Sequence, residues 1–279
     1  MKNHIAIVGA GNGGQAFAGY LSLMGERIKI FDVIPATVEK LNEVGGVLME
    51  GNSKLTGFGK IEKATTSMQE VIEGAKLILI VLPSLYHADM ARQMAPYLKD
   101  GQVIILNPHA SMGPVEFRKV LDDCNVTADV TIGCSSTLLF ACRAVEIGHV
   151  VVAGQKKHLI MSAYPSSRNN VLEEMFKDLI PEFEVVDDVI FYLWEHRSEV
   201  EIRYSIRAYL MRAVRNRCLN ELQSQSHREE LHLSSFLSPE SMDFLDFLFV
   251  DDKQPLGMLL EQELEDELKR SIDELPLEC

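Results

Sequence analysis

The feature that most constrains the fold of this chain is a glycine-rich turn, residues 9–14 (GAGNGG), which directly follows the apolar run of residues 4–8. The run predicts a buried strand, and residues 13–24 predict a helix. Strand, glycine turn and helix in this order are typical of a dinucleotide-binding unit, where the glycines permit a tight turn, close approach of a pyrophosphate and close helix packing. The alternative is a glycine turn within a core that holds no ligand. The candidate cofactor-binding residues here are Gly9, Gly11, Asn12, Gly13 and Gly14.

An acidic residue stands where such a unit needs one. A second predicted strand, residues 27–31, ends at Asp32, about 20 residues beyond the first glycine. A carboxylate there accepts hydrogen bonds from the adenosine ribose hydroxyls and repels a 2′-phosphate. The next residues, Val33-Ile34-Pro35, supply no arginine for such a phosphate. The sequence therefore predicts NAD, and favours it over NADP.

Apolar runs and amphipathic segments alternate through the following hundred or so residues. The glycine-rich stretch 45–61 predicts short strands or a hairpin. The remaining predicted helices are 35–44, 67–73, 86–98 and 113–122, and the remaining predicted strands are 76–82, 102–106 and 129–132. Alternation of this kind predicts an α/β fold with a Rossmann-type, doubly wound parallel sheet over residues 1–190.

Ligands of such sheets bind outside the carboxyl ends of the strands. Two further loops should therefore reach the cofactor, one containing Pro83 and Ser84 and the other running from Asn107 to Ser111. These loops are expected nearer the nicotinamide. His109 is a candidate acid–base group there, and the alternative is a solvated loop histidine.

The bulk properties exclude several classes of protein. The formal net charge of −14 argues against a whole-chain role on nucleic acid or a membrane surface. The first strand begins close to Met1, so no signal peptide is expected, and no apolar run is long enough to span a bilayer. The five cysteines form no C-x-x-C pair. These features predict a cytoplasmic protein without a metal site.

Three segments of residues 1–190 resemble the opine dehydrogenase family, which includes octopine and nopaline dehydrogenases. They are GAGNGGQAFA, LILIVLPSLYHADMARQMAPYLKDGQVIILNP and TLLFACRAVEIGHVVVAGQKKHLIMSAYP. The first is shared with many dehydrogenases, whereas the third is more specific. The resemblance implies a small-molecule enzyme that reductively joins an amino acid to a 2-oxo acid with NADH or NADPH. Arg143 becomes a candidate for binding an anionic substrate group, because its planar fork of donors matches a carboxylate. The alternative is a surface arginine.

The resemblance ends near Phe191. Family members continue into a helical substrate domain with an Asn-x-x-x-His-Pro motif, whose histidine does the proton chemistry. Here the sequence continues as YLWEHR, and no such motif follows. We therefore expect cofactor binding with impaired turnover, since hydride transfer needs an accompanying proton donor or acceptor.

Residues 191–279 differ in composition and predict a smaller all-α segment. The stretch YLWEHRSEVEIRYSIRAYLMRAVRNRCLNELQ resembles part of region 2 of extracytoplasmic-function sigma factors of bacterial RNA polymerase. That resemblance implies a chimera, natural or artificial, with contact to nucleic acid or polymerase disfavoured because both flanking parts of the sigma pattern are missing. The alternative is a solvated, arginine-rich helix face.

Two other functions stay open. One is a reductase of a small 2-oxo or phosphorylated substrate, similar to ketopantoate reductase or glycerol-3-phosphate dehydrogenase. The other is a regulatory protein that uses the cofactor domain as a redox sensor and the helical segment as a contact surface. A homo-oligomer is expected, because a cofactor domain without its usual cover would expose an apolar patch.

Overall fold

The computed structural model of this chain describes residues 3–109 and 112–185. The predicted helical segment 191–279, with its sigma-factor resemblance, lies outside them. An eight-stranded sheet runs through the described part in the order β12-β11-β8-β7-β6-β1-β2-β5. Its strands are β1 (His4–Val8), β2 (Ile28–Phe31), β5 (Lys63–Thr65), β6 (Ala75–Ile80), β7 (Val103–Leu106), β8 (Thr131–Ser135), β11 (Leu159–Tyr164) and β12 (Phe183–Val185).

The centre of this sheet is parallel and fully covered. Strands β1, β6 and β7 pair in parallel, with Ile7 opposite Leu79 and Leu79 opposite Ile105. All three side chains are 0% exposed. Near-continuous apolar runs are what a parallel strand needs when helices cover both of its faces. Strands β11 and β12 run in the opposite direction, because β11 pairs antiparallel with β8 and β12 pairs in parallel with β11.

A second, four-stranded sheet has the order β4-β3-β10-β9. It brings together two parts of the chain that lie far apart in sequence, since β10 pairs in parallel with β3 and antiparallel with β9. The glycine-rich stretch predicted as short strands supplies β3 and β4. The strands are β3 (Gly46–Gly51), β4 (Gly57–Lys60), β9 (Phe140–Glu146) and β10 (His149–Gln155).

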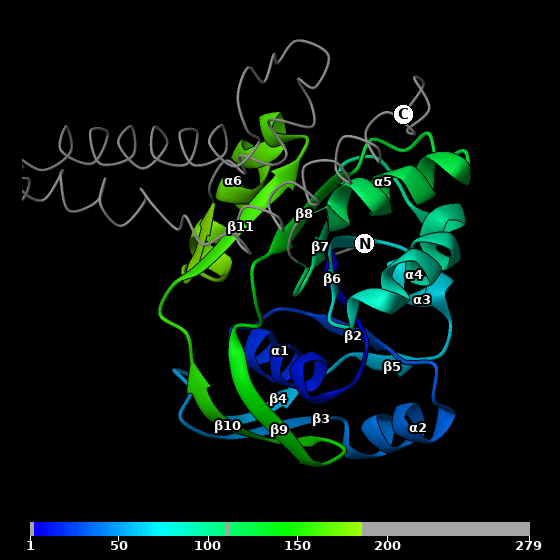
Figure 1. Cartoon of the computed structure of the whole chain (residues 1–279). Helices are drawn as coiled ribbons and strands as arrows, with labels where there is room; N and C mark the ends of the chain where they lie inside the picture. Colours follow the sequence, from blue (N-terminus) through cyan, green and yellow to red (C-terminus); the bar gives the residue numbers. More distant parts are fainter. Residues whose placement is uncertain (1–2, 110–111, 186–279) are drawn as a thin grey trace, which may run out of the picture. The chain divides into compact units, whose positions relative to one another are not determined.

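Helix α1 (Asn12–Leu23) is enclosed by the two sheets (Figure 1). It packs on β1 and β2 on one side and on all four strands of the second sheet on the other. Aromatic packing supports this layer, because the Phe17 and Phe140 rings meet edge to face with centroids 5.2 Å apart. Helix α1 is thereby held between both sheets.

The other helices cover both faces of the larger sheet. Helices α3 (Met68–Ile72), α4 (His87–Met94) and α5 (Gly113–Asp123) share one apolar core with it, on the right in Figure 1. Helix α6 (Asn169–Leu179) packs in the opposite core with α1, and α2 (Pro35–Val44) contributes Val38 and Leu41 to it. Residues 3–109 and 112–185 also contain three short 3-10 turns: η1 (Ser84–Tyr86), η2 (Ala95–Tyr97) and η3 (Ser166–Arg168).

The predicted Rossmann-type α/β fold is confirmed. The helix expected over residues 86–98 is shorter, because Pro96 lacks the N–H that would continue α4, and the chain tightens into η2 instead. The sequence did not indicate that β3, β4, β9 and β10 form a sheet of their own. The domain boundary at residue 190 stays a prediction.

Candidate cofactor-binding site

Two glycines of the turn are required by the backbone conformation and packing of the protein itself. Gly9 has φ +106°, and an added Cβ would lie 2.6 Å from Leu82 Cδ2. A Cβ on Gly14 would lie 1.8 Å from the Gly9 carbonyl oxygen, so the first turn of α1 can approach the end of β1 only without a side chain. Packing alone therefore requires glycine at both positions.

Gly11 is different, because an added Cβ there would meet nothing within 4 Å. Gly11 is the N-cap of α1 and has an extended backbone conformation that other residues also adopt. No contact in the described structure calls for glycine at this position. Open space over the turn is what close approach of a pyrophosphate requires.

The start of α1 is suited to an anion. Its first turn carries no acidic side chain, and no side chain caps its free N–H groups. Those N–H groups and the partial positive charge of the helix end favour a phosphate. Asn12 begins the helix, but its side-chain Oδ1 accepts a hydrogen bond of 3.0 Å from the Ala144 N–H of β9. The side chain of Asn12 therefore ties the turn to the second sheet and leaves its backbone at the anion site.

Asp32 lies directly beside the glycine turn. Its Oδ2 accepts a hydrogen bond of 2.8 Å from the Ala10 N–H, and its Oδ1 accepts one of 3.0 Å from the Ile34 N–H. An ionised carboxylate has about four acceptor positions, so about two remain for ribose hydroxyls. The location fits the ribose-binding role expected from the sequence.

Gln15 is a contributor to this turn that sequence reasoning missed. It is 3% exposed, although a glutamine on a helix usually reads as a surface residue. Its Nε2 donates to the Ala10 carbonyl at 2.8 Å, and its Oε1 accepts from the Gly148 N–H at 2.7 Å. Because Gly148 lies between β9 and β10, Gln15 links the turn to the second sheet.

The loops after β6 and β7 lie at the same edge as the turn. The Val81 N–H donates to the Val8 carbonyl at 2.9 Å, and the Asn107 N–H donates to the Ile80 carbonyl at 2.9 Å. Pro83 and Ser84 follow directly along the first loop. The structure thus brings together the three predicted loops, as their places after neighbouring strands require.

Asn107 is a buried amide whose polar side-chain atoms are unsatisfied. It is 0% exposed, and neither Nδ2 nor Oδ1 has a hydrogen-bond partner in the described part of the chain. Leaving such a group unpaired costs about 1–3 kcal/mol. A ligand or a water molecule at this edge would supply the missing partners, so the observation fits the predicted cofactor role of Asn107.

His109 follows Asn107 by two residues and contacts a second histidine. The Nδ1 atoms of His109 and His87 are 2.8 Å apart, and His87 Nε2 is 2.9 Å from the Leu82 carbonyl oxygen. Burial lowers the pKa of His87 to about 4 and also lowers the pKa of His109. His87 was not singled out from the sequence, where it is one polar residue at the start of a helix.

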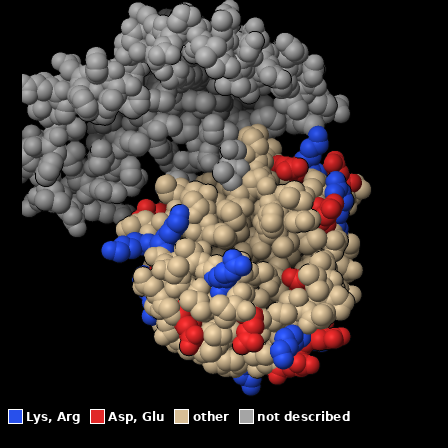
Figure 2. Space-filling model, turned by 60° about the horizontal axis from the view of Figure 1, so that its bottom comes forward, with Lys and Arg blue, Asp and Glu red and all other residues tan. Residues whose placement is uncertain are grey.

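Arg143 lies on β9, opposite Val151 of β10, and its side chain is exposed. Its neighbours Cys142 and Ala144 pack toward the core that contains α1, so alternation along the strand turns Arg143 outward. Figure 2 brings forward the lower part of Figure 1, where Lys, Arg, Asp and Glu are scattered among uncharged residues. The substrate role of Arg143 stays a prediction.

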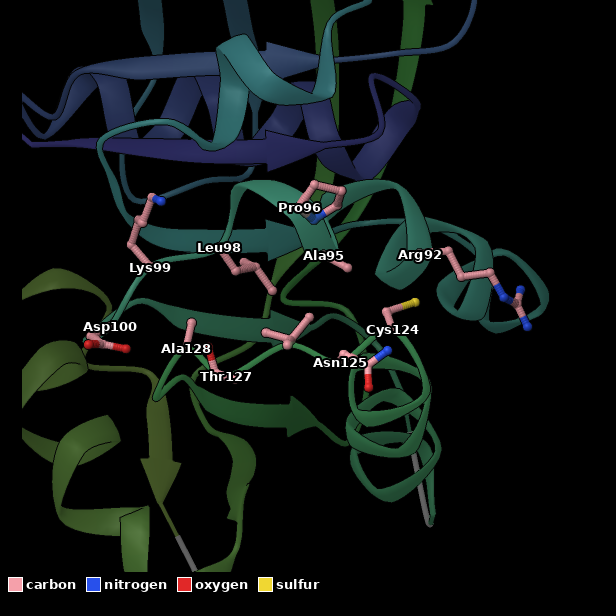
Figure 3. Close-up of a pocket in the computed structure, with 11 residues that line it drawn as sticks. Arg92, Ala95, Pro96, Leu98, Lys99, Asp100, Cys124, Asn125, Thr127 and Ala128 are labelled. Carbon is pink, nitrogen blue, oxygen red and sulfur yellow. The ribbon is translucent and has the colours of Figure 1, made fainter.

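A hollow of about 540 Å³ lies elsewhere on the molecule. Figure 3 shows it between the segment with Leu98 and Lys99 and the segment with Cys124 and Asn125. These segments precede β7 and β8, whereas ligands of a doubly wound sheet bind beyond the carboxyl ends of strands. The hollow is therefore separate from the cofactor edge.

None of the helices in 3–109 and 112–185 is long and apolar enough to cross a membrane. Within the same residues, no three His, Cys, Asp or Glu side chains are grouped to hold a metal ion.

Comparison with known proteins supports the cofactor domain. Residues 4–109 match the family model described as NAD-dependent glycerol-3-phosphate dehydrogenase N-terminus. Opine dehydrogenase from Arthrobacter sp. (strain 1C) is 35% identical over 185 residues, which cover 66% of this chain and 51% of that protein. Octopine dehydrogenase from Pecten maximus is 26% identical over 180 residues, or 61% of this chain and 45% of the relative. The chain thus spans about half the length of these two relatives.

Solved structures show the same fold. Octopine dehydrogenase with NADH and L-arginine superposes with a TM-score of 0.59 at 20% identity, covering 74% of this chain and 56% of the other. The PanE/ApbA family ketopantoate reductase from Ralstonia eutropha gives 0.53 at 22% identity, covering 70% and 59%. The described part is a Rossmann-type NAD(P)-binding domain, similar to the cofactor domains of opine dehydrogenases, ketopantoate reductases and glycerol-3-phosphate dehydrogenases.

Proposed function

We propose that this chain is an NAD-dependent oxidoreductase of the opine dehydrogenase type, which joins an amino acid to a 2-oxo acid by reduction. The observation that carries the proposal is the 35% identity to Arthrobacter opine dehydrogenase, which extends over 185 residues. The glycerol-3-phosphate dehydrogenase model, in contrast, matches residues 4–109 only. The similarity to the opine dehydrogenase therefore extends beyond the segment that matches the glycerol-3-phosphate dehydrogenase model.

The described residues divide the binding of the cofactor among themselves. The uncapped start of α1 holds the pyrophosphate, and the open space at Gly11 lets it approach the backbone. Asp32 holds the adenosine ribose through its remaining acceptor positions. Asn107 satisfies its buried amide at the nicotinamide side. Bound NADH supplies the hydride for the reduction of the substrate.

We infer a preference for NAD over NADP from the surroundings of Asp32. A 2′-phosphate placed beside this carboxylate would meet a like charge, which destabilises the complex. Arg27, at the opposite end of β2, pairs with Glu62 at 2.7 Å. Arg27 therefore lies away from the cofactor edge, where a 2′-phosphate would bind.

We further propose that turnover is slow. The resemblance places the proton chemistry of the family on a histidine in an Asn-x-x-x-His-Pro motif, and residues 191–279 contain no such motif. Whether this segment derives from a sigma factor, and whether the chain is a chimera, remain hypotheses about residues outside the described part. A homo-oligomer and a cytoplasmic location likewise remain predictions.

A substrate panel tests the proposal. The full chain is mixed with NADH, pyruvate and a series of amino acids, and loss of nicotinamide absorbance is followed, with Arthrobacter opine dehydrogenase as the reference. Slow loss that needs both pyruvate and an amino acid is the expected result. Reduction of ketopantoate or dihydroxyacetone phosphate without an amino acid would move the assignment to the other reductases. Absence of NADH binding would refute the assignment as a whole.

A further inference from the structure

Two histidines from different elements meet at the carboxyl edge of the larger sheet. His87 is the first residue of α4 and is 2% exposed. His109 lies in the loop after β7, two residues beyond the unsatisfied amide of Asn107. Their Nδ1 atoms are 2.8 Å apart, which is a hydrogen-bond distance.

The partner of His87 decides which nitrogen carries each proton. His87 Nε2 lies 2.9 Å from the Leu82 carbonyl oxygen, and a carbonyl oxygen only accepts. His87 Nε2 must therefore carry hydrogen, which leaves Nδ1 of the neutral ring as an acceptor. The hydrogen between the two rings then belongs to His109 Nδ1. Neutral His109 consequently has its free electron pair on Nε2.

The position of His109 is also fixed from the other side. A Cβ on Gly113, the first residue of α5, would lie 2.3 Å from the ring atoms of His109. The ring therefore lies directly against the backbone of α5. The backbone N–H of His109 donates to the Ser135 carbonyl of β8 at 3.1 Å. Among residues 3–109 and 112–185, no group is hydrogen-bonded to its Nε2.

We propose that His109 donates and accepts, through Nε2, the proton that accompanies the slow hydride transfer, in place of the histidine of the family's Asn-x-x-x-His-Pro motif, and that His87 is the positioning residue that fixes its tautomer. This inference rests on the proposed function. In the reductive direction the substrate carbon of a C=N bond takes up hydride from NADH. The nitrogen of that bond receives the proton from His109 Nε2, which leaves NAD⁺ and neutral His109. In the reverse direction, the nitrogen returns its proton to Nε2.

The charged groups around the pair set its pH dependence. Burial lowers the pKa of both rings, and a charge on His109 lowers the pKa of His87 further. Glu116 of α5 faces His109 and raises its pKa, which partly offsets burial. On α4, Arg92 pairs with Asp89 at 2.8 Å. Because burial lowers the pKa of His87 to about 4, we assign the exchanged proton to His109 rather than to His87. Reduction should thus slow, and oxidation quicken, as pH rises through the pKa of His109.

Nuclear magnetic resonance of the full chain tests the geometry without any need for turnover. The eight histidines are isotope-labelled, and the ring nitrogens of His87 and His109 are assigned with the variants His87→Gln and His109→Gln. We expect hydrogen on Nδ1 of His109 and on Nε2 of His87. Hydrogen on Nε2 of neutral His109, the form that predominates for an exposed histidine, would overturn the proposal. So would His109 signals that stay unchanged when NAD⁺ saturates the protein.

Kinetic variants test the chemical role. His109→Gln should lower kcat by at least about 100-fold while NADH affinity stays within about 2-fold, because general acid–base catalysis contributes on that scale. His87→Ala should lower kcat and shift the pH profile. His87→Asn should restore much of both, because its amide oxygen can accept from His109 Nδ1–H. Equal kcat and pH profile in His87→Ala and the unmodified chain would refute the role of His87.

The two levels of proposal fail in different ways. If the substrate panel shows no reduction but NADH binds, the opine dehydrogenase assignment fails. The proposed role of His109 in proton transfer is then still tested by its tautomer and by its response to NAD⁺. If turnover is observed and His109→Gln retains it, the proposed role of His109 in proton transfer is refuted, while the opine dehydrogenase assignment stands.

Discussion

Asp32 Oδ2 accepts a hydrogen bond of 2.8 Å from the backbone N–H of Ala10, which joins the end of β2 to the glycine turn after β1. The residue expected to bind the ribose therefore also holds the turn that binds the pyrophosphate. Since its other oxygen accepts from the Ile34 N–H, the carboxylate is oriented before a ligand arrives. Such preorganisation lowers the entropic cost of binding.

Replacement of Asp32 by asparagine should change cofactor choice. The amide has one acceptor oxygen in place of two and carries no charge, so NADH should bind roughly 10-fold more weakly, or about 1.4 kcal/mol. NADPH should be affected less, because the repulsion of its 2′-phosphate is removed. Fluorescence titration with both cofactors measures the ratio of their affinities. An unchanged ratio would show that Asp32 does not contact the ribose.

Replacement of Gly11 by alanine should weaken NADH binding by at least about 10-fold without destabilising the fold. The new methyl group would meet no protein atom within 4 Å, but it would occupy the space proposed for the pyrophosphate. Gly154 offers a matched control, since a Cβ there also meets nothing within 4 Å. NADH affinity in Gly154→Ala should equal that of the unmodified chain. Equal affinities in both variants would exclude the turn as the pyrophosphate site.

Replacement of Gly14 by alanine, in contrast to that of Gly11, should destabilise the fold. Its Cβ would lie 1.8 Å from the Gly9 carbonyl oxygen, so α1 would have to move away from β1. Forced overpacking of this kind costs typically about 1–3 kcal/mol. Urea denaturation followed by circular dichroism should show a lower midpoint than for Gly11→Ala. A midpoint equal to that of the unmodified chain would mean that the turn relaxes without cost.

Acid should destabilise the fold through His87. Its pKa is 6.5 in an ordinary environment and about 4 in the folded chain, so folding favours the neutral ring. The stabilisation is complete above pH 6.5 and is lost as pH falls toward about 4, by roughly 3 kcal/mol in all. Urea midpoints measured across this range should fall less steeply for His87→Gln. The slope that remains should reflect His4 and His109, whose pKa values are also lowered. Identical slopes would contradict the burial of a neutral His87.

Replacement of Gly113 by alanine should displace the ring of His109, because the added Cβ would lie 2.3 Å from it. The expected result is loss of turnover on the scale of His109→Gln, with NADH affinity preserved. The same substitution should shift the ring-nitrogen signals of His109. If those signals and kcat stay the same, α5 does not fix the ring.

The parts of the fold that were predicted correctly are those with local causes. The apolar runs of β6 and β7 are covered on both faces, and such burial leaves a continuous signal in the sequence. The pairing of β3 with β10 left none, because alternation along a strand does not name its partner. The second sheet could therefore not be separated from the first by sequence reasoning.

The candidate site divides in the same way. The glycine turn and Asp32 follow from spacing along the chain, and their neighbourhood in the structure agrees. Gln15 and His87 could not be found in this way. The partner of Gln15, Gly148, lies far away in sequence. The partner of His87, His109, lies in a loop whose path the sequence does not predict. For Arg143, alternation along β9 separates two faces but does not tell which face turns inward.

The bond between Gln15 and the Gly148 N–H has a consequence for how small a working cofactor binder can be. The glycine turn and α1 come from the first 25 residues, yet part of their support is supplied by β9 and β10 (Figure 1). A fragment limited to residues 4–109, the span of the matched family model, would keep Asp32 and every glycine of the turn, as well as the packing of β3 and β4 on α1. It would leave Gln15 half-paired and remove the contacts that β9 and β10 make with α1. The cofactor-binding unit is therefore longer than the glycine motif by which it is recognised. Truncation of the chain to residues 4–109 would remove strands that stabilise the glycine turn.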